Sequence, residues 1–292
     1  MRKRRYINGF LPVAWTLLAS GRGRLFDNPR DLVMDLKTSW LGLELKNPFV
    51  PSASPLSRSL ETAQRLQDAG AAAIVMYSLF EEAVRAEEEG MTRFLHHQET
   101  GNAEAASYLP AKQDFPGELD RYLEQIAALK ATLEIPVVAS LNGVTASGWI
   151  EHASEIADAG ADALELNIYY VAADIQEDGL QVEQRYLRVL QELYKRVEIP
   201  INMKLSPFFS SVGNMVRQLE AAGASGVSLF NRFYQPDIEI DGLRLNNALP
   251  ATRSADALLA MHWVAILHGR VGCSIGATGG VHDSEDAIKM LL

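Results

Sequence analysis

Short apolar runs of strand length alternate along the chain with longer stretches in which apolar residues recur every three or four positions. The run Ala163–Leu166 follows the phrase Ala-Gly-Ala at 159–161 and ends at the polar residue Asn167. Such a run is too short for a separate helix, and glycine tolerates the positive φ at which helices often close. The pattern predicts a helix, a turn, and a strand with a polar residue at its carboxyl end.

Two phrases recur, and each precedes a predicted strand. Ala-Gly-Ala occurs at 69–71, 159–161 and 222–224, while Glu-Ile-Pro occurs at 134–136 and 198–200. Serial units of one strand and one helix build a parallel sheet, and the closed form of such a sheet is an eight-stranded barrel. We therefore predict an α/β fold, a (β/α)8 TIM barrel.

The predicted elements follow in a regular order, beginning with a small hairpin over 35–45 that floors the barrel. Strands are predicted at 49–52, 73–78, 136–140, 163–167, 201–204, 226–231 and 272–277, and helices at 59–69, 117–133, 146–159, 181–196, 214–222 and 252–268, with a last helix opening at Ser284. A long insertion after the second strand, 79–116, is expected to form a lid or substrate wall. A short two-stranded flap is predicted over 233–247.

Both ends of the chain depart from this alternation of strands and helices. Residues 1–33 carry the basic run Arg2–Arg5 and the apolar run Phe10–Ala19, which is typical of a signal-like segment or of an over-long reading frame that natively starts at Met34. We favour the second interpretation and assign the barrel to residues 34–292. The chain stops after the seventh unit, so we expect a barrel truncated before strand 8; the alternative is a strand supplied by a partner.

Composition narrows the class of protein. The net charge of -10 argues against a nucleic-acid binder, and no run is long enough to cross a membrane as a helix. The single cysteine, Cys273, excludes an internal disulfide and fits a reducing compartment. We therefore expect a cytoplasmic protein that acts on a small-molecule substrate, and no metal site.

The predicted strand ends carry the residues that are able to do chemistry. Carboxamides at Asn142, Asn167 and Asn231 offer donors and acceptors together, which suits a neutral heterocycle. Lys204 lies between apolar neighbours, and a buried lysine is costly without a partner, so it is a functional candidate. The sequence Thr-Gly-Gly at 278–280 before a helix indicates half of a phosphate cradle.

Four motifs then resemble one family when they are taken together. They are Asn-Pro-Phe at 47–49, Leu-Glu-Leu-Asn at 164–167, Met-Lys-Leu-Ser-Pro at 203–207 and Gly-Ala-Thr-Gly-Gly at 276–280. In this order they resemble the soluble dihydroorotate dehydrogenases, and the flavin domain of dihydropyrimidine dehydrogenase is also similar. The resemblance implies a (β/α)8 barrel, bound FMN, and oxidation of a dihydropyrimidine, with hydride passing to flavin N5 while a loop base removes the neighbouring proton.

The resemblance also implies roles for single residues. Lys204 stabilises negative charge on the reduced ring, Asn167 and Asn231 bind substrate or flavin edges, and Tyr170 occupies the position of the base. The implied cofactor-binding residues are Ser52, Ala53, Ser78, Asn142, Asn167, Lys204, Gly279 and Gly280. A homodimer and a partner that accepts electrons are further expectations.

The chain departs from the family where substrate is bound. A tyrosine, Tyr77, replaces the lysine that the family has after strand 2, and Tyr170 is a poor base unless the pKa of its phenol, ordinarily ~10, is strongly shifted. We therefore expect a paralogue whose substrate differs from dihydroorotate. Two alternatives stay open: a non-catalytic flavin- or phosphate-binding barrel that has lost its base, and a flavin-free phosphate-binding barrel enzyme.

Overall fold

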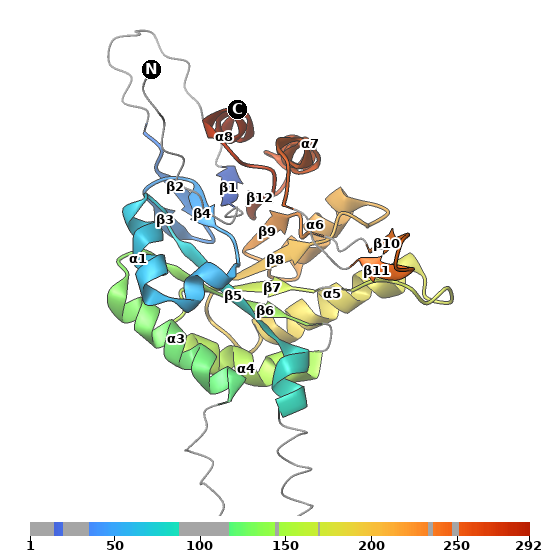
Figure 1. The fold of residues 1–292 in the computed structure, drawn as a ribbon, viewed down its shortest axis with the longest axis horizontal. Helices are drawn as coiled ribbons and strands as arrows, with labels where there is room; N and C mark the ends of the chain where they lie inside the picture. The colour runs from blue at the N-terminus through green and yellow to red at the C-terminus, as the bar shows by residue number, and fades with distance from the viewer. Residues whose placement is uncertain are drawn as a thin grey trace, which may run out of the picture.

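Eight strands form one sheet, which closes into a barrel (Figure 1). The computed structural model describes residues 15–19, 35–87, 117–143, 146–168, 170–232, 236–246 and 251–292. The barrel strands are β1 (Trp15–Ala19), β4 (Phe49–Pro51), β5 (Ile74–Phe80), β6 (Val137–Asn142), β7 (Ala163–Asn167), β8 (Ile201–Leu205), β9 (Gly226–Leu229) and β12 (Ser274–Thr278). Their spatial order is β4-β1-β12-β9-β8-β7-β6-β5.

The strands β12, β9, β8, β7, β6 and β5 run parallel to one another. The two ends of the sheet meet between β4 and β5, where the Ala72 N–H donates to the Phe49 carbonyl at 2.9 Å. A similar bond joins β6 and β7, from the Asp162 N–H to the Val137 carbonyl at 2.9 Å. The predicted α/β barrel is therefore confirmed.

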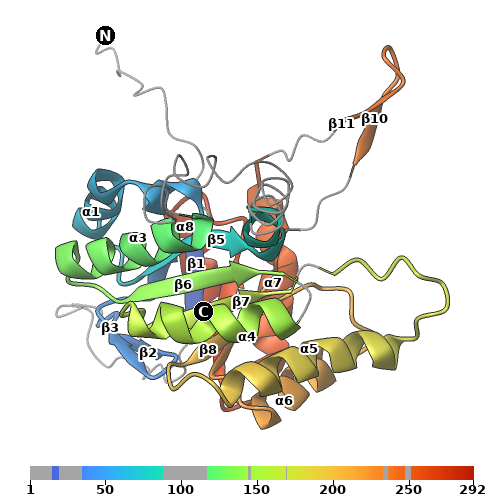
Figure 2. The same cartoon turned by 90° about the horizontal axis from the view of Figure 1, so that it is seen from below.

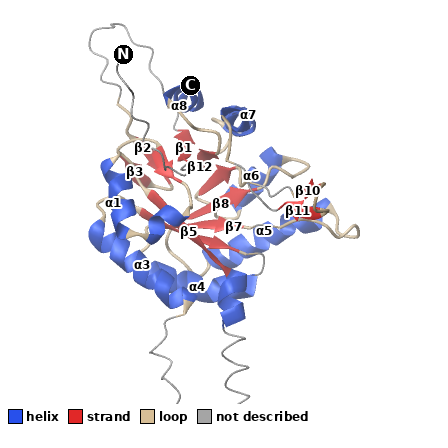
Figure 3. Cartoon of the chain, viewed as in Figure 1, coloured by secondary structure: helices blue, strands red, loops and turns tan. Residues whose placement is uncertain are grey.

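Helices cover the outer face of the strands (Figure 3). They are η1 (Pro55–Arg58), α1 (Leu60–Asp68), a helix over 81–87, α3 (Glu118–Thr132), α4 (Ala146–Asp158), α5 (Gly179–Tyr194), α6 (Val212–Ala221), η4 (Ser254–Asp256), α7 (Ala257–Leu267) and α8 (Ser284–Leu291). No helix in the described ranges is both long and apolar enough to cross a membrane.

The recurring Ala-Gly-Ala phrase closes helices as predicted. Gly70, Gly160 and Gly223 have φ values of 105°, 98° and 108°, in the left-handed region that favours glycine. In the first of these turns the N–H of Ala71 donates to the carbonyl of Leu66 at 3.0 Å, which satisfies a carbonyl that the helix leaves free. The phrase thus turns each helix back toward the start of the next strand.

Helix starts are fixed by side chains. Ser59 caps α1 by accepting from the Thr62 N–H at 3.4 Å. Asp178 and Gln181 cap α5 reciprocally: each side chain accepts from the backbone N–H of the other, at 2.8 Å. This capping box explains why α5 begins at Gly179, before the predicted start at Gln181.

A small hairpin floors the barrel, as predicted. It consists of β2 (Thr38–Trp40) and β3 (Leu43–Leu45), which pair antiparallel. The fully buried Trp40 packs with inward-facing residues of the barrel strands, namely Val50, Val75, Val138 and Ala163. The amino end of the barrel is therefore filled by apolar side chains, which leaves the chemistry to the carboxyl end.

Residues 15–19, part of the segment 1–33 that we expected to lie outside the barrel, form one of its strands. Strand β1 pairs antiparallel with β12 on one side and with β4 on the other, in the position left open for an eighth strand. That prediction rested on the basic residues at the start of this segment and on its place in the chain. It missed that an apolar run of strand length satisfies two open strand edges.

The predicted flap is also confirmed. Its strands, β10 (Asp237–Glu239) and β11 (Arg244–Asn246), pair antiparallel and extend away from the barrel (Figure 2). Most of the predicted insertion, including the histidine pair at 96–97, lies outside the described residues. The insertion begins with a helix at 81–87, directly after β5.

Packing of the floor makes a first prediction. A Cβ added at Gly226 would lie 2.5 Å from Leu41 Cδ2 and 3.1 Å from the Ser274 carbonyl. Overpacking of this kind costs about 1–3 kcal/mol, so Gly226→Ala should lower the free energy of unfolding by that amount in a urea titration. Gly213→Ala in α6, where the nearest atom is at 3.9 Å, is the control and should be stabilising by about 0.5–1 kcal/mol. Equal effects of the two substitutions would contradict the packing of the floor.

Candidate functional site

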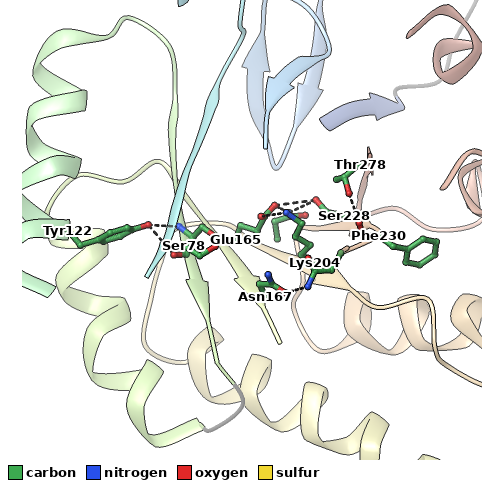
Figure 4. Close-up of polar contacts among 11 residues, drawn as sticks. Ser78, Tyr122, Glu165, Asn167, Lys204, Ser228, Phe230 and Thr278 are labelled. Atoms are coloured by element: carbon green, nitrogen blue, oxygen red, sulfur yellow. Dashed lines mark hydrogen bonds and ion pairs between the residues drawn. The ribbon is translucent and has the colours of Figure 1, made fainter. Parts of the chain in front are cut away.

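Three residues predicted from separate strands meet at the carboxyl end of the barrel (Figure 4). Asn167 ends β7, and its register partner on β8 is Lys204. Asn231, just after β9, donates through Nδ2 to the Asn167 Oδ1 at 2.9 Å. The sheet register thus converts residues scattered through the sequence into one polar cluster at the mouth of the barrel.

Lys204 is buried, and a carboxylate that was not among the predicted site residues holds it. The Lys204 Nζ lies 3.2 Å from the Glu165 Oε1, and the two side chains are 9% and 1% exposed. Glu165 lies two residues before Asn167 on β7, so both side chains point into the barrel. The signal in the sequence was a charge between two leucines of a buried strand, which requires a partner.

Beneath this ion pair the barrel interior stays polar. Asn202 donates through Nδ2 to the Glu165 Oε2 at 3.1 Å and to the Ser228 Oγ at 2.8 Å. Ser228 donates to the same Glu165 oxygen at 3.4 Å. Of the side-chain atoms in this layer, the Asn202 Oδ1 has no partner among the described residues.

A β-bulge determines which way the side chains of β5 point. The pairing of β5 with β6 shifts register between Val75 and Ser78. Ser78 then contacts the Ser140 Oγ at 2.9 Å inside the barrel, whereas Tyr77 packs edge-to-face on Tyr122 in the outer core. Tyr77 therefore points away from the interior and is a packing residue.

The remaining predicted flavin-lining residues are less closely tied to the cluster. Asn142 pairs in register with Asn167 and is half-buried at the end of β6. Ser52 follows β4 and is buried, and Ala53 packs against the floor cluster. Their roles toward a cofactor stay predictions.

The Thr-Gly-Gly loop follows β12 at the same end of the barrel. Gly279 and Gly280 have φ values of 87° and 73°, and the Thr278 Oγ1 donates to the Phe230 carbonyl at 2.6 Å (Figure 4). A Cβ at Gly280 would lie 2.2 Å from the Ala257 nitrogen, so the loop packs closely on the first turn of α7. At Gly279 the nearest atom to an added Cβ, Thr252 Cγ2, is at 3.9 Å.

The start of α8 is already occupied by a cap. Asp283 accepts from the Asp286 N–H at 2.9 Å. Hydrogen bonds from the Ser254 hydroxyl and the His282 N–H hold the pKa of the Asp286 carboxyl below its usual value. The expected role of the α8 dipole in binding an anion is therefore weakened by a carboxylate, and the glycine loop is the better candidate for a phosphate.

Tyr170 belongs to a separate network. Its hydroxyl donates to the Glu177 Oε2 in a short contact, and Arg185 both pairs with the Glu177 Oε1 at 2.7 Å and stacks 4.1 Å over the Tyr170 ring. The hydrogen bond to Glu177, and then burial, raise the pKa of Tyr170 above its ordinary value. This direction is opposite to the one that a base requires.

The fold and the cluster together define a TIM-barrel protein that keeps its polar chemistry at the carboxyl ends of the strands. No family model matches the chain. The catalytic subunit of dihydroorotate dehydrogenase B (NAD(+)) from Geobacillus sp. (strain WCH70) is 25% identical over 263 residues, which is 85% of this chain and 78% of the relative. Dihydroorotate dehydrogenase A (fumarate) from Lactobacillus delbrueckii subsp. bulgaricus is 23% identical, over 86% of this chain and 81% of the relative.

The similarity to dihydroorotate dehydrogenases predicted from the four motifs is thus confirmed along most of the chain. Among solved structures, a putative dihydrodipicolinate synthase family protein from Coccidioides immitis matches with a TM-score of 0.39 and 13% identity, over 62% of this chain and 50% of that one. This likeness is distant, and the barrel is defined by the strand order and register described above.

The Tyr170 network makes a prediction about acid stability. Hydrogen bonds from Tyr170 and then Arg185 lower the pKa of Glu177 from its ordinary 4.5, so this carboxylate stabilises the fold above pH 4.5, and that stability is lost as the pH falls through the lowered value. Tyr170→Phe removes the larger cause, so the thermal midpoint of this variant should fall less steeply on acidification than that of the parent. Tyr194→Phe, at an exposed position, is the control. Identical slopes for the parent and Tyr170→Phe would contradict the network.

Proposed function

We propose that this chain is an FMN-dependent oxidoreductase of the dihydroorotate dehydrogenase type, which oxidises a dihydropyrimidine-type substrate at a CH–CH bond. When bound, FMN supplies the hydride acceptor at its N5 atom. The observation that carries the proposal is the buried Lys204 ammonium beside Asn167 and Asn231 at the mouth of the barrel. The names of the relatives support a pyrimidine-type substrate and a role in pyrimidine biosynthesis.

Two features of the chain fit FMN. An ammonium in a dry site stabilises negative charge that develops on a ring, and Lys204 would do so at the N1/C2 edge of the flavin. An added Cβ at Gly279 would meet no atom closer than Thr252 Cγ2 at 3.9 Å, an ordinary contact distance, and a phosphate would lie against the backbone N–H groups of Gly279 and Gly280. The ring and the phosphate would thus be held by residues from different strands of one rim.

The other residues at the rim would orient the ligands. Asn167 and Asn231 already hydrogen-bond each other, so together they present a fixed set of donors and acceptors to a substrate or a flavin edge. Smaller or neutral side chains would line the ring, and we assign this role to Ser52, Ala53, Ser78 and Asn142.

Tyr170 is our candidate for proton transfer. Its phenol already donates to Glu177, so it takes up a substrate proton only as its own proton moves to the Glu177 Oε2. In that step the substrate C–H bond breaks, a new O–H bond forms on Tyr170, and the proton released by Tyr170 ends on Glu177. The lowered pKa of Glu177, which also pairs with Arg185, opposes this transfer.

The two named relatives differ in what receives the electrons. One is the catalytic subunit of an enzyme named for NAD(+), and the other is named for fumarate. We propose that this chain also passes electrons to an acceptor beyond the substrate, as a homodimer in the cytoplasm.

The proposal is tested by titrating the purified chain with FMN and with riboflavin while following flavin fluorescence. We expect one FMN per chain, bound at least about tenfold more tightly than riboflavin, because charged groups in hydrogen bonds contribute about 1.5–3 kcal/mol. Lys204→Met should weaken both flavins by roughly tenfold or more, since it removes a contact to the ring. Gly279→Val should weaken FMN alone, since a branched side chain at this left-handed position distorts the loop that would hold the phosphate.

Lys195→Met is the matched control, because Lys195 is an exposed lysine paired with Glu192 on the outer face. It should leave both affinities unchanged. A parent chain that binds neither flavin would refute the proposal, as would equal losses in the Lys204 and Lys195 variants.

A second function is favoured by one observation, the raised pKa of Tyr170. A barrel that binds flavin but whose tyrosine keeps its proton would be a non-catalytic flavin-binding protein. Mixing the flavin-bound chain with dihydropyrimidines without oxygen separates the two functions: bleaching of the flavin absorption band that slows in Tyr170→Phe indicates the enzyme. Bound flavin that no dihydropyrimidine bleaches indicates the binding protein.

A further inference from the structure

One carboxylate lies inside the barrel, and the proposed chemistry assigns it no role. Leu164 and Leu166 pack in the outer core, and Glu165 between them points inward because side chains alternate along a strand. Its side chain is 1% exposed. A buried charge is costly unless it is paired and hydrogen-bonded, so its partners indicate what the carboxylate is for.

Its two oxygens have different partners. The Glu165 Oε1 faces the Lys204 Nζ at 3.2 Å, toward the mouth of the barrel. The Oε2 accepts from the Asn202 Nδ2 on β8 at 3.1 Å and from the Ser228 Oγ on β9 at 3.4 Å (Figure 4). Residues on β8 and β9 therefore fix the carboxylate, and through Oε1 it holds the ammonium.

We propose that Glu165 is a positioning residue of the ring-binding site: it holds the Lys204 ammonium at the barrel mouth and balances its charge. This inference rests on the proposed function and deepens it. A lone ammonium would favour an anionic ligand at all times. Paired with Glu165 it is neutral overall, so the resting site suits an uncharged ring, while the ammonium remains beside the negative charge that the ring gains on reduction.

The pairing has a measurable consequence. Glu165→Gln keeps the shape and a hydrogen-bond acceptor but removes one negative charge from the pair. The site then carries a net positive charge, which favours the reduced, anionic ring over the oxidised ring. We expect the ratio of the dissociation constants for oxidised and reduced FMN to rise by roughly tenfold or more, read as a positive shift of the flavin midpoint potential.

The matched control is Glu220→Gln. Glu220 is a carboxylate at the other end of the barrel, where it accepts from the backbone N–H of Cys273 at 2.8 Å. The same chemical change there should leave the midpoint potential unchanged. A Glu165→Gln variant that binds FMN with an unshifted or lowered potential would overturn the inference.

A measurement without flavin tests the Glu165–Lys204 ion pair itself, which we call the tether. Acetic anhydride acylates neutral amines, and acylation of Lys204 is followed by peptide mass spectrometry with the exposed Lys195 as internal reference. Lys204 should react several-fold faster relative to Lys195 in Glu165→Gln than in the parent, because its ammonium loses its buried counter-ion. Ser228→Ala, which removes a single donor to the Glu165 Oε2, should give a smaller increase in the same direction and serves if Glu165→Gln does not fold.

The outcomes separate this inference from the proposed function. If the parent binds no flavin but the tether variants acylate faster at Lys204, the proposed function fails and the tether stands. If FMN binds as expected but neither the acylation rate nor the midpoint potential responds to Glu165→Gln, the proposed function stands and the positioning role fails.

Discussion

The structure depends on one ion pair inside the barrel, between Lys204 on β8 and Glu165 on β7. Neither charge is tolerated alone in an interior of this kind, because desolvation of an unpaired ion costs several kcal/mol. Together they are stable only because Asn202 and Ser228 satisfy the second carboxylate oxygen. The pair thus explains both why the centre of the barrel is polar and why an ammonium remains available at its mouth.

The side chains inside the barrel change from apolar to polar along the barrel axis. The candidate site lies at the polar end. The hairpin around Trp40 fills the amino end with apolar packing, the ion pair and its partners occupy the middle, and carboxamides such as Asn167 lie at the rim. A rigid floor and a clamped middle layer leave the rim residues few alternative positions. Such preorganisation is what a site needs if it is to stabilise charge that appears only during a reaction.

The sequence patterns predicted the features that local backbone geometry and strand direction determine. The Ala-Gly-Ala turns, the parallel order of the strands and the convergence of Asn167 with Lys204 all follow from helix closure and strand polarity. The partner of Lys204 could not be predicted, because which carboxylate faces it depends on the register of β7 against β8. The register shift in β5 that turns Tyr77 outward, and the pairing of β1 between β12 and β4, likewise depend on contacts distant in the sequence.

The side-chain NMR signal of Lys204 tests most directly whether its ammonium faces a bound flavin ring, as we propose. The signal is assigned in a 15N-lysine sample by its loss in Lys204→Met and is followed during a titration with FMN. Our account predicts that it shifts on binding and saturates at one FMN per chain, while the signal of Lys195 stays constant. A bound flavin that leaves the Lys204 signal unmoved would contradict the account.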